Sequence, residues 1–431
     1  MRSGDPEARI EPEDEAICAS EDPPGDQVGL WPRDGLREGG GTRPARETAA
    51  ADGGGKPIAP ADRGPKPIAP PIVQTSLFTF PDFQSLLDGL AAEHEASVYS
   101  RGRNPTVAAA ERKIAALERG DACLCFGSGM GAVSAVMLGL LEAGDHVLFV
   151  NQVYGPTLEL AGHLERFGVE HDLLLELDPA AVEAAMRPNT RLVWLESPGT
   201  MLFRMLDLPA VAEVAHEGGA LVCVDNSWAS PLFQKPLTLG ADIVVHSCTK
   251  YLGGHSDLVA GAVVSDAERV ERIFYRAYQL NGAVLAPFDA WLLLRGIRTL
   301  PVRMRRHHAD ALRVAAFLDG HPAVRRVFHP ALAADPGLVE RQLHGFSGLF
   351  SFELADGDFE TVRRALDGLR RIRIGVSWGG YESLALSPNN GRNGEALETR
   401  GIPGGLIRLS VGLEGADLLI EELDRALEAV G

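Results

Sequence analysis

Two ionisable residues, Asp225 and Lys250, follow apolar runs of the sequence. Residues 221–224 are apolar and end at Asp225, and residues 243–245 lead into a polar cluster that ends at Lys250. Such runs are typical of buried strands, and a parallel sheet binds its ligand outside the carboxyl ends of its strands. We therefore expect Asp225 and Lys250 to lie side by side at one site.

Lys250 is suited to chemistry that arginine cannot perform. The chain has 41 Lys and Arg residues, of which only five are lysines. Arginine stays protonated, whereas a desolvated lysine can lose its proton and attack a carbonyl to form a Schiff base. A surface lysine near a turn is the alternative interpretation.

The residues around Lys250 favour a carbonyl cofactor that carries a phosphate. Ser247 and Thr249 precede the lysine, and their hydroxyls could donate to phosphate oxygens. Asp225 could keep a pyridine nitrogen protonated, so that the ring accepts electrons. A lysine, a strand-end aspartate and Ser-x-Thr-Lys are together the parts that a pyridoxal 5'-phosphate site requires. The sequence therefore predicts this cofactor.

A glycine turn offers a further place for the phosphate. Residues 127–130 read Gly-Ser-Gly-Met and open a predicted helix that runs to about residue 141. A helix N-terminus points free backbone N–H groups outward, which suits a phosphate. Because Gly-Ser-Gly is also common in ordinary turns, a turn without a ligand is the alternative.

Several separated motifs carry a resemblance to a known family. Residues 99–106 read Tyr-Ser-Arg-Gly-Arg-Asn-Pro-Thr. With the motifs above, this segment resembles the Cys/Met-metabolism family of pyridoxal-phosphate enzymes, which contains cystathionine lyases and synthases. The resemblance extends from about residue 70 to the C-terminus. The cofactor-binding residues that it implies are Lys250, Asp225, Ser247, Thr249, Gly129, Met130, Tyr99, Arg101 and Tyr154.

The resemblance also implies roles that the residue types alone do not establish. Tyr99 and Arg101 are expected to reach into the adjacent subunit and bind its phosphate, for which the planar guanidinium is suited. Tyr154 is expected to stack on the pyridine ring. The catalytic residues implied are Lys250, Tyr154 and Tyr99. A solvated loop arginine and a core tyrosine are the alternatives for Arg101 and Tyr154.

Three residues near the C-terminus are expected to bind substrate. Arg408 lies on an otherwise apolar predicted strand, where a charged side chain needs a partner. The resemblance implies that Arg408 holds the substrate α-carboxylate, and a structural salt bridge is the alternative. Ser377 and Trp378 resemble residues that line the substrate side of the pocket.

Two local patterns bear on which branch of the family the chain resembles. Residues 377–383 read Ser-Trp-Gly-Gly-Tyr-Glu-Ser, whereas γ-type members have Leu in place of Trp378. Residues 196–200 read Glu-Ser-Pro-Gly-Thr and lack the Asn of the γ-type pattern. Both patterns, and Asp225-Asn-Ser-Trp228, resemble the bacterial cystathionine β-lyase branch. Asn104, Pro105 and Gly155 instead match the general family better than that branch.

The composition argues against several classes of binding partner and of cellular location. A net charge of −18 argues against nucleic acid or an anionic membrane as a partner. The longest apolar stretch, around residues 132–141, is too short to span a bilayer, and the N-terminus lacks the apolar core of a secretory signal. The cysteines have no zinc-binding spacing, so we expect no metal site. We expect a cytoplasmic protein with a small amino-acid substrate.

Alternating strand and helix patterns predict an α/β fold with a mostly parallel sheet. Helices are expected at residues 107–117, with Glu111 and Lys113 exposed, at 302–318 and at 417–430. The resemblance implies the fold-type-I architecture, in which a large cofactor-binding domain precedes a smaller C-terminal α/β domain. The expected divisions are a disordered low-complexity tail at 1–65, an N-terminal arm at 66–98, the large domain at 99–298 and the C-terminal domain at 299–431.

The favoured hypothesis is a pyridoxal-phosphate-dependent lyase that cleaves L-cystathionine by β-elimination to homocysteine, pyruvate and ammonia. One alternative is a γ-type relative, namely a cystathionine γ-synthase, a γ-lyase or an O-acyl-homoserine sulfhydrylase. An alternative of another class is a catalytically silent, cofactor-binding regulator. The resemblance further implies a homotetramer whose active sites are shared between subunits.

Overall fold

The computed structural model describes residues 67–430. The predicted tail at residues 1–65 lies outside the described residues. Within the described part, no helix combines the length and the apolar character that crossing a bilayer requires.

The larger of two sheets has seven strands. They are β1 (Ala122–Phe126), β2 (His146–Val150), β3 (Glu170–Leu174), β4 (Thr190–Leu195), β5 (Leu221–Asp225), β6 (Ile243–His246) and β7 (Gly261–Ser265). Their order across the sheet is β1-β7-β6-β5-β4-β2-β3. The five strands from β6 to β3 are parallel, whereas β7 is antiparallel to both of its neighbours.

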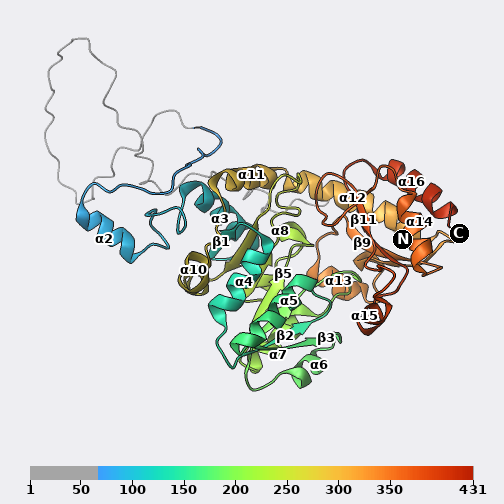
Figure 1. The fold of residues 1–431 in the computed structure, drawn as a ribbon, viewed down its shortest axis with the longest axis horizontal. Coiled ribbons are helices and arrows are strands. Elements are labelled where there is room, and N and C mark those ends of the chain that lie inside the picture. The colour runs from blue at the N-terminus through green and yellow to red at the C-terminus, as the bar shows by residue number, and fades with distance from the viewer. Residues whose placement is uncertain (1–66, 431) are drawn as a thin grey trace, which may run out of the picture. The chain divides into compact units, whose positions relative to one another are not determined.

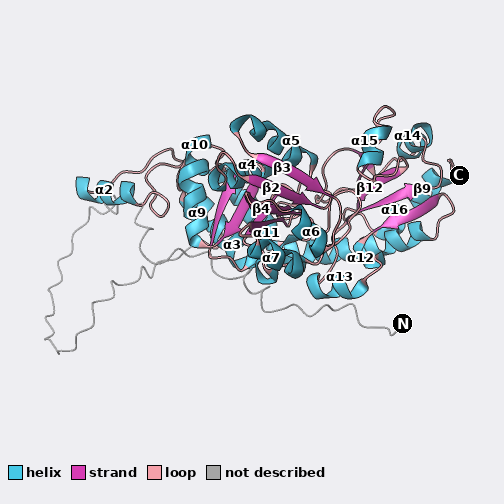
Figure 2. Ribbon diagram, turned by 90° about the horizontal axis from the view of Figure 1, so that it is seen from below, coloured by secondary structure: helices cyan, strands magenta, loops and turns pink. Residues whose placement is uncertain are grey.

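Helices follow most of these strands in the chain and lie beside the sheet in Figures 1 and 2. They are α3 (Pro105–Glu118), α4 (Gly129–Leu140), α5 (Gly155–Leu164), α6 (Pro179–Ala185), α7 (Leu208–Glu217), α8 (Ser230–Phe233), α9 (Ala267–Ile273), α10 (Gln279–Asn281) and α11 (Pro287–Arg298). The helix α2 (Phe83–Ala91) precedes them in the arm.

Both faces of the sheet are buried, which explains why its strands read as continuous apolar runs. In β1, Leu124 packs in the core cluster that includes α4 and α9, whereas Cys123 and Cys125 pack in the cluster that includes α3 and α11. A third cluster covers the other part of this second face with α7. The four cysteines of the described part are all buried.

The helix α3 corrects one expectation. Glu111 and Lys113 were expected to be exposed, but they are only 5% and 7% exposed. The Glu111 carboxylate accepts a hydrogen bond from the Cys125 backbone N–H at 3.0 Å and lies 3.6 Å from the Arg103 guanidinium. Since α3 packs against both β1 and α11, Glu111 and Lys113 are buried rather than solvated.

The smaller sheet has five strands and follows the larger one in the chain. They are β8 (Val324–Phe328), β9 (Leu349–Leu354), β10 (Arg373–Ile374), β11 (Leu384–Leu386) and β12 (Leu406–Ser410), in the order β10-β11-β12-β9-β8. The accompanying helices are α12 (Leu300–Asp319), α13 (Pro336–Gln342), α14 (Phe359–Asp367), α15 (Gly394–Thr399) and α16 (Ala416–Glu428).

The predicted fold class is confirmed: a large, mostly parallel sheet precedes a smaller sheet, and helices accompany both (Figure 1). The expected helices at 302–318 and 417–430 correspond to α12 and α16. All strands of the larger sheet lie within residues 99–298 and all strands of the smaller one within 299–431. We propose these ranges as the two domains.

Two buried histidines of the C-terminal region should make stability depend on pH. Burial lowers the pKa of His307 to about 4 and that of His329 to about 3. In the unfolded chain histidine titrates near 6.5, so the unfolded state binds protons first as the pH falls below that value. We expect the free energy of unfolding to drop by about 2–3 kcal/mol per histidine between pH 7.5 and pH 4.5.

Urea unfolding at the two pH values measures this drop. The variant His329→Gln should show a smaller drop than the wild type, because its side chain does not titrate. An equal drop in both proteins would show that His329 does not contribute.

Candidate active site

The structure brings Lys250 together with residues of the smaller sheet. The Lys250 Nζ donates a hydrogen bond to the Ser377 Oγ at 2.5 Å and lies 5.3 Å from the centre of the Trp378 ring. Arg408, on β12, donates to the Ser377 backbone oxygen at 3.4 Å. Gly379 has a φ of +83°, and a Cβ there would lie 3.1 Å from the Lys250 Cα. The segment that follows Ser377 therefore lies directly on the lysine.

Asp225 lies near Lys250, as the sequence predicts. It ends β5, and its partner in the parallel pairing with β6 is Val245. The charges of Asp225 and Lys250 affect each other's pKa, which places the two groups close together. The carboxyl edge of the larger sheet thus faces the Ser377 segment and Arg408.

The surroundings of Lys250 make it a base near neutral pH. Burial lowers its pKa to about 8; the Arg408 charge acts in the same direction, and Asp225 partly opposes both. Burial also lowers the pKa of Arg408 to about 10, and the guanidinium is only 9% exposed. A buried guanidinium needs an anionic partner, and the α-carboxylate of an amino acid fits this need.

A second buried carboxylate, Glu196, faces Asp225. Burial raises the pKa of Asp225, whereas hydrogen bonds from Ser227 and the charges of His246 and Lys250 oppose the rise. Burial and the Asp225 charge raise the pKa of Glu196 well above its ordinary value. The Glu196 Oε1 accepts from the Tyr154 backbone N–H at 2.6 Å. Two acids at neighbouring strand ends therefore compete for ionisation.

The predicted phosphate-binding turn lies beside Ser247. Ser128 caps α4 by accepting from the Gly131 backbone N–H at 2.9 Å, and the helix begins at Gly129. A Cβ at Gly129 would lie 3.0 Å from the Ser247 Oγ. A side chain at position 129 would therefore crowd Ser247. Backbone N–H groups, including that of Met130, and one serine hydroxyl meet at this point, which suits a phosphate.

The Thr249 hydroxyl is engaged elsewhere in the structure. It donates to the Ala260 backbone oxygen at 3.1 Å and accepts from the Ala260 N–H at 3.0 Å. Donation from Thr249 to a phosphate, as the resemblance implies, requires the hydroxyl to turn away from Ala260.

Three predicted residues are exposed. The Arg101 guanidinium lies over the Tyr99 ring, 5.3 Å from its centre, and Tyr99 is 46% exposed. Within the described residues, no hydrogen bond or ion pair joins either side chain to Lys250. Tyr154 precedes α5 and is 50% exposed. The structure thus leaves all three side chains accessible at the surface of this chain.

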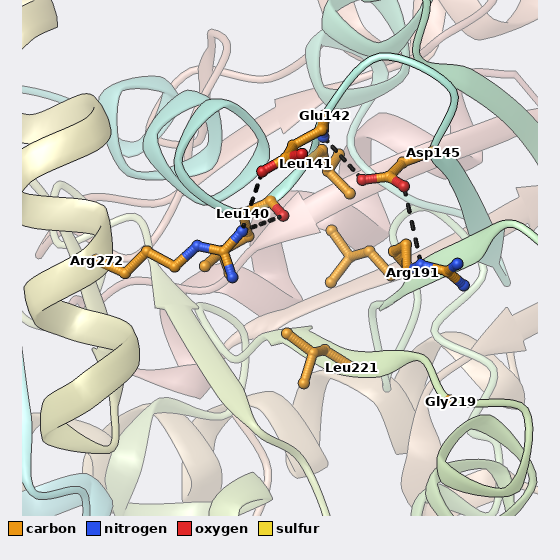
Figure 3. Close-up of a pocket in the computed structure, with 9 residues that line it drawn as sticks. Leu140, Leu141, Glu142, Asp145, Arg191, Gly219, Leu221 and Arg272 are labelled. Atoms are coloured by element: carbon orange, nitrogen blue, oxygen red, sulfur yellow. Dashed lines mark hydrogen bonds and ion pairs between the residues drawn. The ribbon is translucent and has the colours of Figure 1, made fainter.

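A separate cavity of about 280 Å³ (Figure 3) lies at the amino ends of the parallel strands, opposite the ends that carry Asp225 and Glu196. Its lining includes residues at or next to the amino ends of strands, among them Asp145, Arg191 and Leu221. Arg191 pairs with Asp145 at 3.8 Å, and Arg272 with Glu142 at 3.9 Å. Because ligands of parallel sheets bind at the carboxyl ends, this cavity is not the candidate active site.

The pKa of Lys250 predicts how the protein without cofactor takes up pyridoxal phosphate. Attack on the carbonyl requires the neutral amine, of which about a tenth is present at pH 7 when the pKa is about 8. We expect the uptake rate, followed by absorbance, to rise with pH and to have its midpoint near 8. Arg408→Gln should raise the midpoint, and Arg191→Gln, at the opposite edge, should leave it unchanged. A wild-type midpoint above 10 would contradict the expectation.

Comparison with known proteins decides the family. The model of the family described as "Cys/Met metabolism PLP-dependent enzyme" matches residues 59–428. The chain belongs to this family. The family depends on pyridoxal phosphate, so the predicted cofactor and the resemblance are confirmed.

Relatives in the family carry different lyase names. An L-methionine gamma-lyase of Fusobacterium nucleatum subsp. polymorphum is 41% identical over 369 residues, covering 84% of this chain and 93% of the relative. A cystathionine gamma-lyase of Bacillus subtilis is 40% identical, covering 84% and 94%. A cystathionine beta-lyase of Bordetella avium is 40% identical, covering 83% and 91%. The chain therefore belongs with pyridoxal-phosphate-dependent lyases.

A solved structure of the same family supports the fold. The crystal structure of metB from Corynebacterium glutamicum matches with a TM-score of 0.82 and 30% sequence identity, covering 99% of this chain and 100% of that chain.

Sequence reasoning missed two parts of this family member's site. Glu196 follows the last residue of β4, as Asp225 ends β5, so the same strand-end rule could have found it. The Glu118 Oε1 lies 2.5 Å from the His246 Nε2. This pair had no signal in the sequence, because its two residues come from distant segments.

Proposed function

We propose that the protein cleaves L-cystathionine by β-elimination to homocysteine, pyruvate and ammonia. The observation that carries the proposal is the position of Trp378, whose ring lies 5.3 Å from the Lys250 Nζ. A large indole at this point narrows the space beside the base. The Bordetella avium relative, a cystathionine beta-lyase, supports the choice.

The proposed roles follow from the geometry of the site. Pyridoxal phosphate, when bound, supplies the electron sink that acidifies the substrate Cα proton. Lys250 removes that proton, since a base with a pKa of about 8 is suited to neutral pH. Arg408 binds the α-carboxylate, and Asp225 holds the proton on the pyridine nitrogen. Tyr154 would stack on the pyridine ring of the bound cofactor.

The remaining residues hold the cofactor and the base in place. Ser247 and the N–H groups of Gly129 and Met130 would bind the phosphate, with Thr249 after its hydroxyl has turned. Ser377 accepts from Lys250 and so fixes the position of its Nζ.

The β and γ reactions differ in the number of proton transfers. In β-elimination, the thiolate at Cβ departs once the Cα proton has been removed. In γ-elimination, a second proton must leave Cβ, and the pocket must accommodate the longer rearrangement. Trp378 and Tyr381 are large side chains at this segment, and Thr200 stands where γ-type members have Asn. These residues favour the β reaction.

A γ-elimination is the second candidate, because the relatives named gamma-lyase are 40–41% identical to this chain. A catalytically silent regulator is disfavoured, since the chain retains Lys250, Asp225 and Arg408 together.

Product analysis tests the proposal. We expect purified enzyme and L-cystathionine to yield pyruvate and homocysteine, with little 2-oxobutyrate. Trp378→Leu, which restores the γ-type residue, should raise the share of 2-oxobutyrate, and Trp291→Leu, the same substitution on α11, is the control. A wild-type product that is mainly 2-oxobutyrate and cysteine would favour the γ reaction.

Assembly and location belong to the same proposal. We propose a cytoplasmic homotetramer whose neighbouring subunits share active sites. The exposure of Tyr99 and Arg101 supports the sharing.

A further inference from the structure

A buried acid–imidazole pair, Glu118 and His246, is connected to the strand ends that carry Asp225 and the residue after it. The His246 Nε2 is 2.5 Å from the Glu118 Oε1, and the side chains are 1% and 0% exposed. Glu118 ends α3, and His246 ends β6. Neither residue has a role in the function proposed above.

Glu118 is connected to the ends of both strands that form the site. His246 follows Val245, the partner of Asp225 in the parallel pairing. Asn226 follows Asp225 and donates its side-chain N–H to the Glu118 Oε1 at 2.8 Å. The single oxygen Oε1 therefore contacts the residue after Asp225 and the imidazole beside it. Replacing Glu118 would therefore disturb Asp225 through two contacts, namely that with Asn226 and that with His246.

The charges around Asp225 oppose one another. Burial and Glu196, on one side, favour its protonated form. His246 and Lys250, on the other sides, favour the carboxylate. Lys250 cannot serve this purpose alone, because it must be uncharged before it can act as a base. When Lys250 is neutral, His246 is the remaining neighbour that opposes the effect of burial on the pKa of Asp225.

The other titratable groups nearby do not change this balance. Burial raises the pKa of the Cys223 and Cys248 thiols well above the ordinary value, so both stay neutral. The Lys235 ammonium donates to the Leu117 backbone oxygen, next to Glu118.

We propose that Glu118 and His246 form a positioning pair that keeps Asp225 ionised and thereby keeps the cofactor pyridine nitrogen protonated. Glu118, whose Oε1 lies 2.5 Å from the His246 Nε2, fixes the imidazole beside Asp225 and is the carboxylate partner that a buried imidazolium would need. His246 then offsets the effect of Glu196 on Asp225. This inference rests on the proposed contact of Asp225 with the ring, and it does not depend on which sulfur substrate is cleaved.

The test uses the full-length holoenzyme with ¹⁵N-labelled pyridoxal phosphate. The pyridine ¹⁵N chemical shift, followed against pH, reports the protonation of the ring nitrogen without substrate. In Glu118→Gln and in His246→Gln we expect the midpoint of this titration to fall by at least about one pH unit, a tenfold change in the protonation ratio. We expect kcat to fall about tenfold as well, with little change in KM.

A matched control comes from a pair at the surface. The His216 Nε2 lies 2.8 Å from the Asp242 Oδ2, and His216 is 45% exposed. His216→Gln removes the same kind of contact away from Asp225 and should leave the ¹⁵N titration unchanged.

Double variants separate an effect through Asp225 from a structural one. In the Asp225→Asn background, His246→Gln should cause no further loss of kcat or cofactor affinity, because it acts only through the carboxylate. Losses that simply add would overturn the proposal. If His246→Gln fails to fold, as judged by circular dichroism, Glu118→Gln gives the same comparison.

The outcomes also separate this inference from the proposed function. If Asp225→Asn shifts the ¹⁵N titration and both single variants of the pair leave it unchanged, the positioning pair is wrong and the role of Asp225 stands. If Asp225→Asn itself leaves the titration unchanged, the proposed ring contact is wrong, and the inference is overturned with it.

Discussion

Lys250→Ala should reduce turnover by at least about a thousandfold, since the variant lacks both the base and the cofactor attachment. The variant Lys250→Arg should lose as much turnover as Lys250→Ala. Arginine keeps the positive charge beside Asp225 but does not release its proton near neutral pH. The steady-state rate with L-cystathionine measures both variants. Activity of Lys250→Arg near the wild-type level would show that the site needs only a charge there.

Chemical trapping checks the attachment separately. Borohydride reduction of the loaded enzyme should leave the cofactor covalently on the peptide that contains Lys250. The two other lysines of the described part, Lys113 and Lys235, are buried and should carry no label. A label on either one would contradict the assignment.

Mixing two inactive variants should restore activity if the sites are shared between subunits. Arg101→Ala and Lys250→Ala should each be nearly inactive. After joint unfolding and reassembly at equal amounts, half of the dimers are mixed, and each mixed dimer has one intact site of two. We therefore expect about a quarter of the wild-type activity.

The control for this experiment mixes Lys250→Ala with Asp225→Asn. Within each site, Lys250 and Asp225 come from the same subunit. Every site of a mixed dimer therefore remains defective, and activity should not return. Mass spectrometry establishes that mixed oligomers have formed. If they form and the first mixture stays inactive, the site belongs to a single chain. The exposed apolar residues of α2, namely Phe83, Leu87 and Leu90, agree with an arm that packs on a neighbour.

The predictable part of the site consists of residues whose place follows from a local pattern. Asp225 and Lys250 each follow an apolar run, and the carboxyl ends of adjacent parallel strands must meet. Arg408 is a charge within an apolar strand. In each case one short segment holds the whole signal, and the fold class follows from the same alternation of strands and helices.

The parts that were missed depend on packing between distant segments. Glu118 and His246 are 128 residues apart, and no local pattern indicates that they touch. Glu111 and Lys113 looked like the solvated positions of an amphipathic helix, yet α3 is enclosed on several sides. The hydrogen bonds between the Thr249 hydroxyl and the Ala260 backbone likewise depend on the position of the segment that leads into β7.

The burial of the cysteines has a consequence for an enzyme that releases a thiol. Cys123, Cys125, Cys223 and Cys248 are all buried, and burial raises the pKa of the Cys123, Cys223 and Cys248 thiols well above the ordinary value. Exchange with disulfides requires an accessible thiolate. These four side chains can therefore stay reduced and unmodified while a thiol product and its disulfide accumulate around the folded protein.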